Sequence, residues 1–138
     1  MLLDSATVES NFQRFIDRAV ENEVIFYLAN KDGVATSVSN EDDETVILLF
    51  WSDRAYASRA KKCFDENFDE MEIELFDFLY RWLPGMSGDE VLAGPNWNGD
   101  LVGREVDPFE LREMIEEKMP SELVAKYERK YIDLTENT

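Results

Sequence analysis

The stretch "TVILLFWSD", residues 45–53, does most to decide the fold. Every position from Val46 to Trp51 is apolar, and a short run of this kind is typical of a strand that is covered on both faces. Ser52 stands where a helix N-cap is expected, and Asp53 would lie in the first turn, where the helix dipole favours an anion. We therefore predict a central strand over residues 45–51 that leads directly into a helix.

The residues that follow this helix predict a second strand. The segment "EMEIEL", residues 70–75, alternates Met71, Ile73 and Leu75 with glutamates, which is the pattern of a strand with one buried face. A strand, a helix and a strand in this order favour a parallel pair joined by a right-handed crossover. We expect these two strands to be neighbours in one sheet.

Upstream, the pattern predicts a helix and a β-hairpin. Residues 7–22 carry apolar side chains at helical spacing. Two β-prone runs, 23–29 and 34–39, flank an Asp-Gly turn signal and are expected to pair. The charged run "EDDE", residues 41–44, lacks the ligand spacing and the glycine of an EF-hand loop, so we interpret it as an exposed turn.

Three further helices are predicted from their start and stop signals. Pro84-Gly85 is expected to end a helix that begins at Phe76. Asp107 precedes a proline and a glutamate in the order that opens a helix. The last helix covers residues 121–134 and places its apolar side chains on one stripe.

Between these helices, the dipeptide Asn98-Gly99 predicts a hairpin over residues 91–106. A two-residue loop would place Ala93 opposite Arg104. Pro95 has no N–H to donate to a sheet, so its strand should lie at an edge or contain a bulge.

One face of this hairpin is a candidate ligand-binding site. Gly94 and Gly103 are expected to face each other across the two strands, with Asn96 beside them, while Trp97 would lie on the opposite, apolar face. Paired glycines allow a flat ligand or another backbone to approach closely. We take Gly94, Asn96, Gly103 and Trp97 as candidate ligand-binding residues. The alternative is that one of the protein's own helices packs on the glycine face.

Together these signals predict the fold class and the domain organisation. The fold is α+β (mixed α/β): a central mixed sheet of about six strands with two hairpins, flanked by helices and ending in a helical C-terminus. The chain of 138 residues suits a single domain over 1–138, since domains of this size bury enough apolar surface for a core.

The residue types exclude several kinds of site. The chain has no histidine and one cysteine, which excludes an internal disulfide, His-based zinc sites and any Ser-His-Asp or Cys-His catalytic unit. Cys63 is expected to be buried among apolar neighbours and inert. No carboxylate pair stands out by its spacing. We therefore expect no catalytic residue, no metal and no cofactor.

The formal charge of −17, from 31 acidic and 14 basic residues, limits the partners. Such a charge repels phosphate backbones and anionic lipid surfaces, so we expect no nucleic acid and no membrane as partner. Such a charge favours a basic protein partner; the alternative, which has the stronger prior, is that it serves solubility alone. The N-terminus has no signal-peptide pattern and no apolar run is long enough for a membrane span, so we expect a cytoplasmic protein.

Three strings carry a resemblance to a known family: "FWSDRAYA" (50–57), "FLYRWLPGM" (78–86) and "VLAGPNWNGDLVGREVDPFEL" (91–111). Together they resemble a small bacterial family of unknown function, DUF2750. The resemblance covers residues 7–118 and leaves the helix over 121–134 as an extension. Pro95 stands where the family pattern leads us to expect an apolar β-former. The family has no assigned activity, so the resemblance implies no catalytic residue.

Three functions remain open. The first is a non-catalytic protein-binding module, such as an inhibitor or immunity protein that masks a basic partner. The alternative is a small-molecule binder, or a weak carboxylate-based hydrolase, with a site near the 91–106 hairpin. The third is a structural subunit that forms a homodimer through an edge strand or the last helix.

Overall fold

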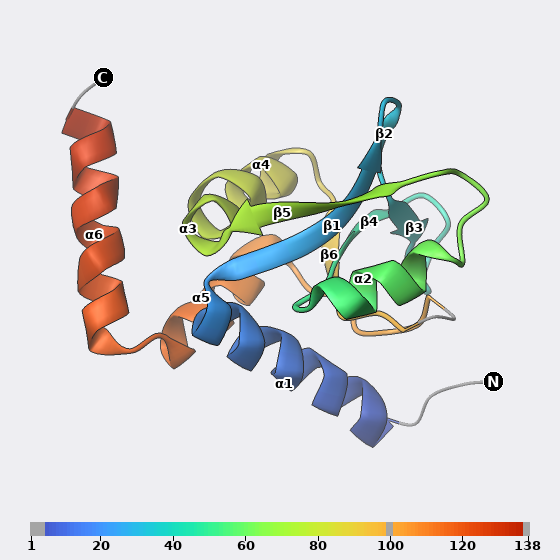
Figure 1. The fold of residues 1–138 in the computed structure, drawn as a ribbon, viewed down its shortest axis with the longest axis horizontal. Helices are drawn as coiled ribbons and strands as arrows, with labels where there is room; N and C mark the ends of the chain where they lie inside the picture. Colours follow the sequence, from blue (N-terminus) through green and yellow to red (C-terminus); the bar gives the residue numbers. More distant parts are fainter. Residues whose placement is uncertain (1–4, 99–100, 137–138) are drawn as a thin grey trace.

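A computed structural model describes residues 5–98 and 101–136 of the chain. In chain order its elements are α1 (Ser5–Asn22), β1 (Val24–Asn30), β2 (Gly33–Val34), β3 (Thr36–Val38), β4 (Val46–Phe50), α2 (Arg54–Lys61), β5 (Asp69–Glu74), α3 (Leu75–Asp77), the π-helix η1 (Phe78–Trp82), α4 (Leu83–Gly88), β6 (Leu92–Pro95), α5 (Pro108–Lys118) and α6 (Ser121–Glu136). Strands and helices are interspersed along the chain, so the predicted α+β class is confirmed (Figure 1).

The six strands form two sheets of three rather than one central sheet. Their orders are β2-β1-β5 and β3-β4-β6. The predicted strand over 34–39 divides at Ala35, so β2 pairs with β1 and β3 pairs with β4. A bridge between Phe26 and Trp51 joins the two sheets, with an N–H···O hydrogen bond of 2.8 Å in each direction. The first predicted turn is confirmed, since Asn30 lies opposite Gly33.

Strand β4 lies at the centre of its sheet and is covered on both faces, as its sequence predicts. Ile47, Leu49 and Trp51 join one buried cluster beneath α2. Leu48 and Phe50 contact the other cluster. From Ile47 onward both faces are covered by apolar groups, which explains the apolar run, whereas Val46 at its start is 38% exposed.

The parallel partner of β4 is β6 and not β5, so the predicted pairing is wrong. Ile47 lies opposite Leu92 and Phe50 opposite Pro95. Strand β5 instead pairs with β1 in the antiparallel direction, from Val24 opposite Glu74 onward. The glutamates of β5 remain exposed or half-buried, which suits the edge of a sheet and not a neighbour of a fully covered strand. The connection from β4 to its parallel partner therefore runs through α2, β5 and the helix that follows.

The predicted stop at Pro84-Gly85 is also wrong, because both residues lie inside a helix. Elements α3, η1 and α4 are consecutive and carry the chain in helical conformation to Gly88. Pro84 has no N–H and clashes with the carbonyl of the preceding turn. The π-turn over η1 lies immediately before it, where the N–H of Leu83 bonds to the carbonyl of Phe78. We attribute the π-turn to the accommodation of Pro84.

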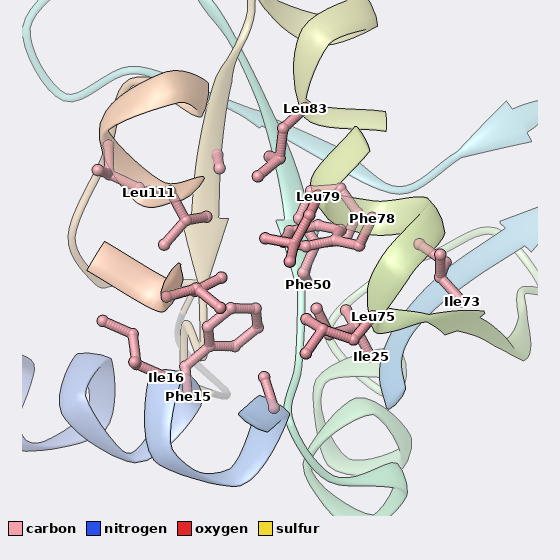
Figure 2. Packing of buried hydrophobic residues seen from close by; sticks show 14 of the residues in the cluster. Phe15, Ile16, Ile25, Phe50, Ile73, Leu75, Phe78, Leu79, Leu83 and Leu111 are labelled. Carbon is pink, nitrogen blue, oxygen red and sulfur yellow. The ribbon is translucent and has the colours of Figure 1, made fainter. Parts of the chain in front are cut away.

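The larger hydrophobic cluster is shown in Figure 2. Phe15 and Ile16 of α1 and Leu111 of α5 point toward Phe50 of β4 and Leu79 of η1. All of these side chains are almost completely buried. The predicted helical phase of residues 7–22 is thus confirmed, since the buried side chains of α1 lie on one face.

The C-terminal helices begin as predicted, and α6 lies at one end of the molecule (Figure 1). The Asp107 carboxylate caps α5 by accepting hydrogen bonds from the N–H groups of Phe109 and Glu110. Helix α6 buries one of its side chains, Tyr127, whose ring lies 5.4 Å from that of Phe76. α6 is therefore attached to the body through a small contact.

Candidate functional site

The two glycines of the predicted site face the indole ring of Trp97. A methyl group added to Gly94 would lie 2.8 Å from Trp97 Nε1, and one added to Gly103 would lie 2.9 Å from Trp97 Cγ. Trp97 is 2% exposed, and its Nε1 donates to the carbonyl of Arg104 at 2.9 Å. The close approach predicted at the glycines is real, but the group that approaches them is not a helix. It is the indole ring of Trp97.

The assignment of Trp97 to the opposite face was wrong because strand alternation breaks at Asn96. Asn96 has a φ of 52°, in the left-handed region that asparagine tolerates better than most residues. The predicted hairpin over 91–106 is also wrong as a pair of strands: β6 pairs with β4, and residues 101–106 form no strand, only a bridge in which Ala93 lies opposite Val106 rather than Arg104. Gly99 of the predicted turn, and Asp100 after it, lie outside the described residues. β6 is an edge strand, as Pro95 predicts.

The buried side chain of Asn96 ties three separate segments together. Its Oδ1 accepts from the N–H of Ser52 at 2.9 Å, and its Nδ2 donates to Ser52 Oγ at 3.0 Å. The same Nδ2 donates to the carbonyl of Asn11 at 3.2 Å. Its amide is thus committed to the protein, and Asn96 shapes the site without offering a group to a ligand. The helix N-cap is Asp53 and not Ser52, which is buried.

A pocket of about 420 Å³ lies where these three segments meet. It is lined by Asn11, Arg14, Trp51, Tyr56, Arg59, Asn96, Trp97 and Asn98, and we call it the arginine pocket. Of the four predicted ligand-binding residues, Asn96 and Trp97 line it, whereas Gly94 and Gly103 do not. Trp51 Nε1 donates to the carbonyl of Trp97 at 2.9 Å, which joins the two aromatic walls.

Two guanidinium groups converge on this pocket around Tyr56. Arg14 of α1 donates from Nη1 to the Tyr56 hydroxyl at 2.7 Å. The guanidinium carbon of Arg59 lies 5.1 Å from the centre of the Tyr56 ring. In the part of the chain that the structure describes, neither arginine forms an ion pair. The pocket therefore has two positive charges, and no carboxylate of residues 5–98 or 101–136 forms an ion pair with either of them.

Arg18, one turn along α1 from Arg14, differs from Arg14 and Arg59 because it pairs with a carboxylate. It forms an ion pair with Asp53 at 2.7 Å. Burial opposes ionisation of the Asp53 carboxyl, but hydrogen bonds from Arg18 and Ser52, with the nearby charges of Arg18 and Arg14, lower its pKa below the ordinary value. Asp53 is thus an ionised carboxylate at neutral pH and already has its partner.

Sequence reasoning missed the arginines of this pocket. Arg59 lies three residues after Tyr56 on one helix, and this spacing was an available signal. Arg14 lies on α1, far from Arg59 in the chain, and no local pattern links the two.

The structure also corrects the expectation for Cys63. It is exposed, beyond the end of α2, rather than buried on its apolar face. Within residues 5–98 and 101–136, no three His, Cys, Asp or Glu side chains gather as ligands for a metal ion. No helix in the same ranges is long and apolar enough to cross a membrane.

Comparison with known proteins places the chain in a family. A family model described as "Protein of unknown function (DUF2750)" matches residues 12–115 of the 138. The chain therefore belongs to the DUF2750 family, as its sequence motifs predict. The matched region contains the residues that line the arginine pocket apart from Asn11, and it ends before α6. No curated protein and no solved structure matches the chain.

Proposed function

We propose that this protein is a non-catalytic binding module that holds a small anionic molecule in the arginine pocket. The observation that carries the proposal is the pair formed by Arg14 and Arg59, which line one pocket and form no ion pair with any carboxylate that the structure describes. Of the two small-molecule functions considered above, this one agrees with the geometry. Asp53, the carboxylate on which the charge of Arg14 acts, has a lowered pKa and a partner, so it is unsuited to act as a general acid.

The charge of the protein strengthens this proposal. With 31 acidic residues in the chain, a basic side chain can readily find a carboxylate, and seven ion pairs are present among the described residues. Two guanidinium groups held near each other repel, and a bound anion would offset that repulsion. Guanidinium groups bind carboxylates and phosphates through charge-assisted, often bidentate hydrogen bonds.

One wall of the pocket suits a ligand with a planar ring. Trp51, Tyr56 and Trp97 line the pocket together with three asparagines, but Trp51 and Trp97 are 0% and 2% exposed, so the half-buried Tyr56 ring is the one that a ligand can contact. A volume of about 420 Å³ lies in the range of small-molecule sites, which combine apolar walls with a few polar groups. We therefore expect the ligand to carry a carboxylate or phosphate group on a small ring.

Titration with benzoate, followed by NMR, tests the proposal. Benzamide is the uncharged match, and phenyl phosphate distinguishes phosphate from carboxylate preference. Benzoate or phenyl phosphate should shift resonances of Trp51, Tyr56 and Trp97, and benzamide should bind at least about tenfold more weakly, since a hydrogen bond to a charged group contributes about 1.5–3 kcal/mol.

Charge-matched variants separate the pocket from the general field of the protein. Arg14→Gln and Arg59→Gln should each weaken binding by about tenfold or more. Arg129→Gln removes the same charge from α6, outside the pocket, and should leave binding unchanged. Equal binding of benzamide, or an equal loss in Arg129→Gln, would exclude an anion site.

Binding of a basic protein partner is a second proposed function, and α6 favours it. Tyr131, Ile132 and Leu134 are 50%, 51% and 40% exposed on this helix. Retention of a basic protein at low ionic strength, lost at high ionic strength, is the expected result of a pulldown. Retention that does not depend on salt would show that charge attraction does not drive the binding. A cytoplasmic location in a bacterial cell also stays a proposal, which cell fractionation would test.

A further inference from the structure

A second pocket, of about 410 Å³, lies where α6 meets η1 and α5. It is lined by Tyr80, Arg112, Glu116, Tyr127, Glu128, Tyr131 and Ile132, and we call it the α6 groove. Its chemistry is opposite to that of the arginine pocket. We infer that the α6 groove receives an arginine or lysine side chain from a basic segment of a partner protein, an inference that rests on the second proposed function.

The aromatic rings of the groove are the first reason. Tyr80 and Tyr131 meet at a ring-centre distance of 5.8 Å and an angle of 67°, and Tyr131 is half exposed. The face of a tyrosine ring attracts a cation that lies within about 6 Å of its centre. The protein itself shows that this wall accepts a guanidinium, because the guanidinium carbon of Arg112 lies 5.8 Å from the centre of the Tyr80 ring.

The carboxylates of the groove are the second reason. Glu116 accepts a hydrogen bond of 2.7 Å from the Tyr80 hydroxyl. Burial, followed by this hydrogen bond, raises the pKa of Tyr80, so the phenol remains a neutral donor near neutral pH. Glu128 is exposed on α6 and has no ion pair among the residues that the structure describes. The two carboxylates outnumber the one guanidinium of Arg112.

The surroundings of the groove indicate a protein segment as the occupant. On the other side of Tyr131, a smaller hollow of about 280 Å³ is lined by Phe76, Tyr80, Arg81, Tyr131, Leu134 and Thr135. Exposed Ile132 and Leu134 can contact the apolar stem and the neighbouring residues of the segment. The total charge of −17 would draw a basic partner toward this surface.

The probe that tests this inference is the single residue N-acetyl-arginine methylamide, with N-acetyl-citrulline methylamide as its uncharged match. In NMR titrations of the full chain, the arginine compound should shift resonances of Glu128, Tyr131 and Ile132. The citrulline compound should bind about two- to fivefold more weakly, as expected for loss of a cation over an exposed ring. Equal binding of both compounds would overturn the inference, and so would shifts spread evenly over the acidic surface.

Two pairs of variants sharpen the test. Glu128→Gln should weaken binding of the arginine compound, whereas Glu122→Gln removes the same charge from α6 outside the groove and should not. Arg112→Ala removes the guanidinium that competes for the Tyr80 wall and should strengthen binding relative to Arg129→Ala, which matches it in charge. The inference would be overturned if Glu122→Gln weakened binding as much as Glu128→Gln. It would also be overturned if Arg112→Ala bound the arginine compound no more tightly than Arg129→Ala, because the cation would then not bind in the groove. Circular dichroism of each variant confirms that it is folded.

Discussion

At the scale of single residues, the packing around Trp97 shapes the candidate site. Its ring lies against Gly94 and Gly103, and its carbonyl accepts the indole N–H of Trp51. The two glycines in the sequence predict that some group packs closely against them. The sequence does not predict that this group is Trp97, because the left-handed φ of Asn96 reverses the expected face of Trp97. A single backbone dihedral of this kind has no periodic signature.

Gly103→Ala should destabilise the protein by about 2–4 kcal/mol, since the new methyl group would collide with the buried Trp97 ring and force it to move. Gly85→Ala is the matched control, because a methyl group at Gly85 meets nothing within 4 Å and lies in helix α4. Gly85→Ala should be neutral or stabilising by up to about 1 kcal/mol. Urea unfolding of both variants gives the comparison, and equal stabilities would contradict the packing described for Trp97.

At the scale of elements, hydrogen bonds and ion pairs between polar side chains join helix α2 to strand β5. Ser58 and Lys61 of α2 both bond to Glu70, and Arg54 pairs with Glu72. The alternation of β5 predicts a strand, and that strand is present. Its partner could not be predicted, because the same alternation suits any sheet edge, and β1 and β4 were both available to it. The Pro84 signal failed in a similar way, since a π-turn allows a helix to continue past a proline.

This junction predicts a pH effect. The hydrogen bond from Ser58 is the main cause that lowers the pKa of Glu70 from 4.5 to about 2. A depressed pKa stabilises the folded state above the unfolded value, and that contribution is lost as the pH falls from about 4.5 toward 2. In Ser58→Ala the pKa of Glu70 should rise toward 4.5, and stability should fall less steeply over this range. NMR titration of the Glu70 side chain measures this, with Glu72 as internal reference. A Glu70 pKa unchanged by Ser58→Ala would refute the assignment.

At the scale of the whole molecule, the family core and α6 are unequal parts. The match to the family ends at residue 115, and α6 contributes one buried side chain. The sequence predicted the helices and the α+β class, but the predicted second strand of the 91–106 hairpin is absent from the described residues 101–106, since Val106 forms only an isolated bridge to Ala93. It did not predict the division into two sheets, because Ala35 looks like any small residue within a strand. The arginine pocket was also out of reach, since Arg14 and Arg59 come from separate helices, α1 and α2, and are brought together only by their contacts with Tyr56.

Truncation after Pro120 should leave a cooperatively folded protein that binds benzoate as the full chain does. The expected loss of stability is about 2–4 kcal/mol, from the lost burial of Tyr127 and its hydrogen bond of 2.8 Å to Glu23. Tyr127→Ala in the full chain should reproduce most of this loss in thermal unfolding. Binding of the arginine compound should disappear on truncation. A truncated chain that fails to fold would show that α6 belongs to the core.

The ties made by Asn96 have a consequence for the order of folding. Its amide joins segments that are 44 and 85 residues away along the chain. Contacts of such separation close large loops, and that entropy must be overcome before the contacts can form. The pocket should therefore be completed late, after the helices and local turns. A ligand of the pocket would then bind the native chain alone, slowing its unfolding while leaving the rate of refolding unchanged.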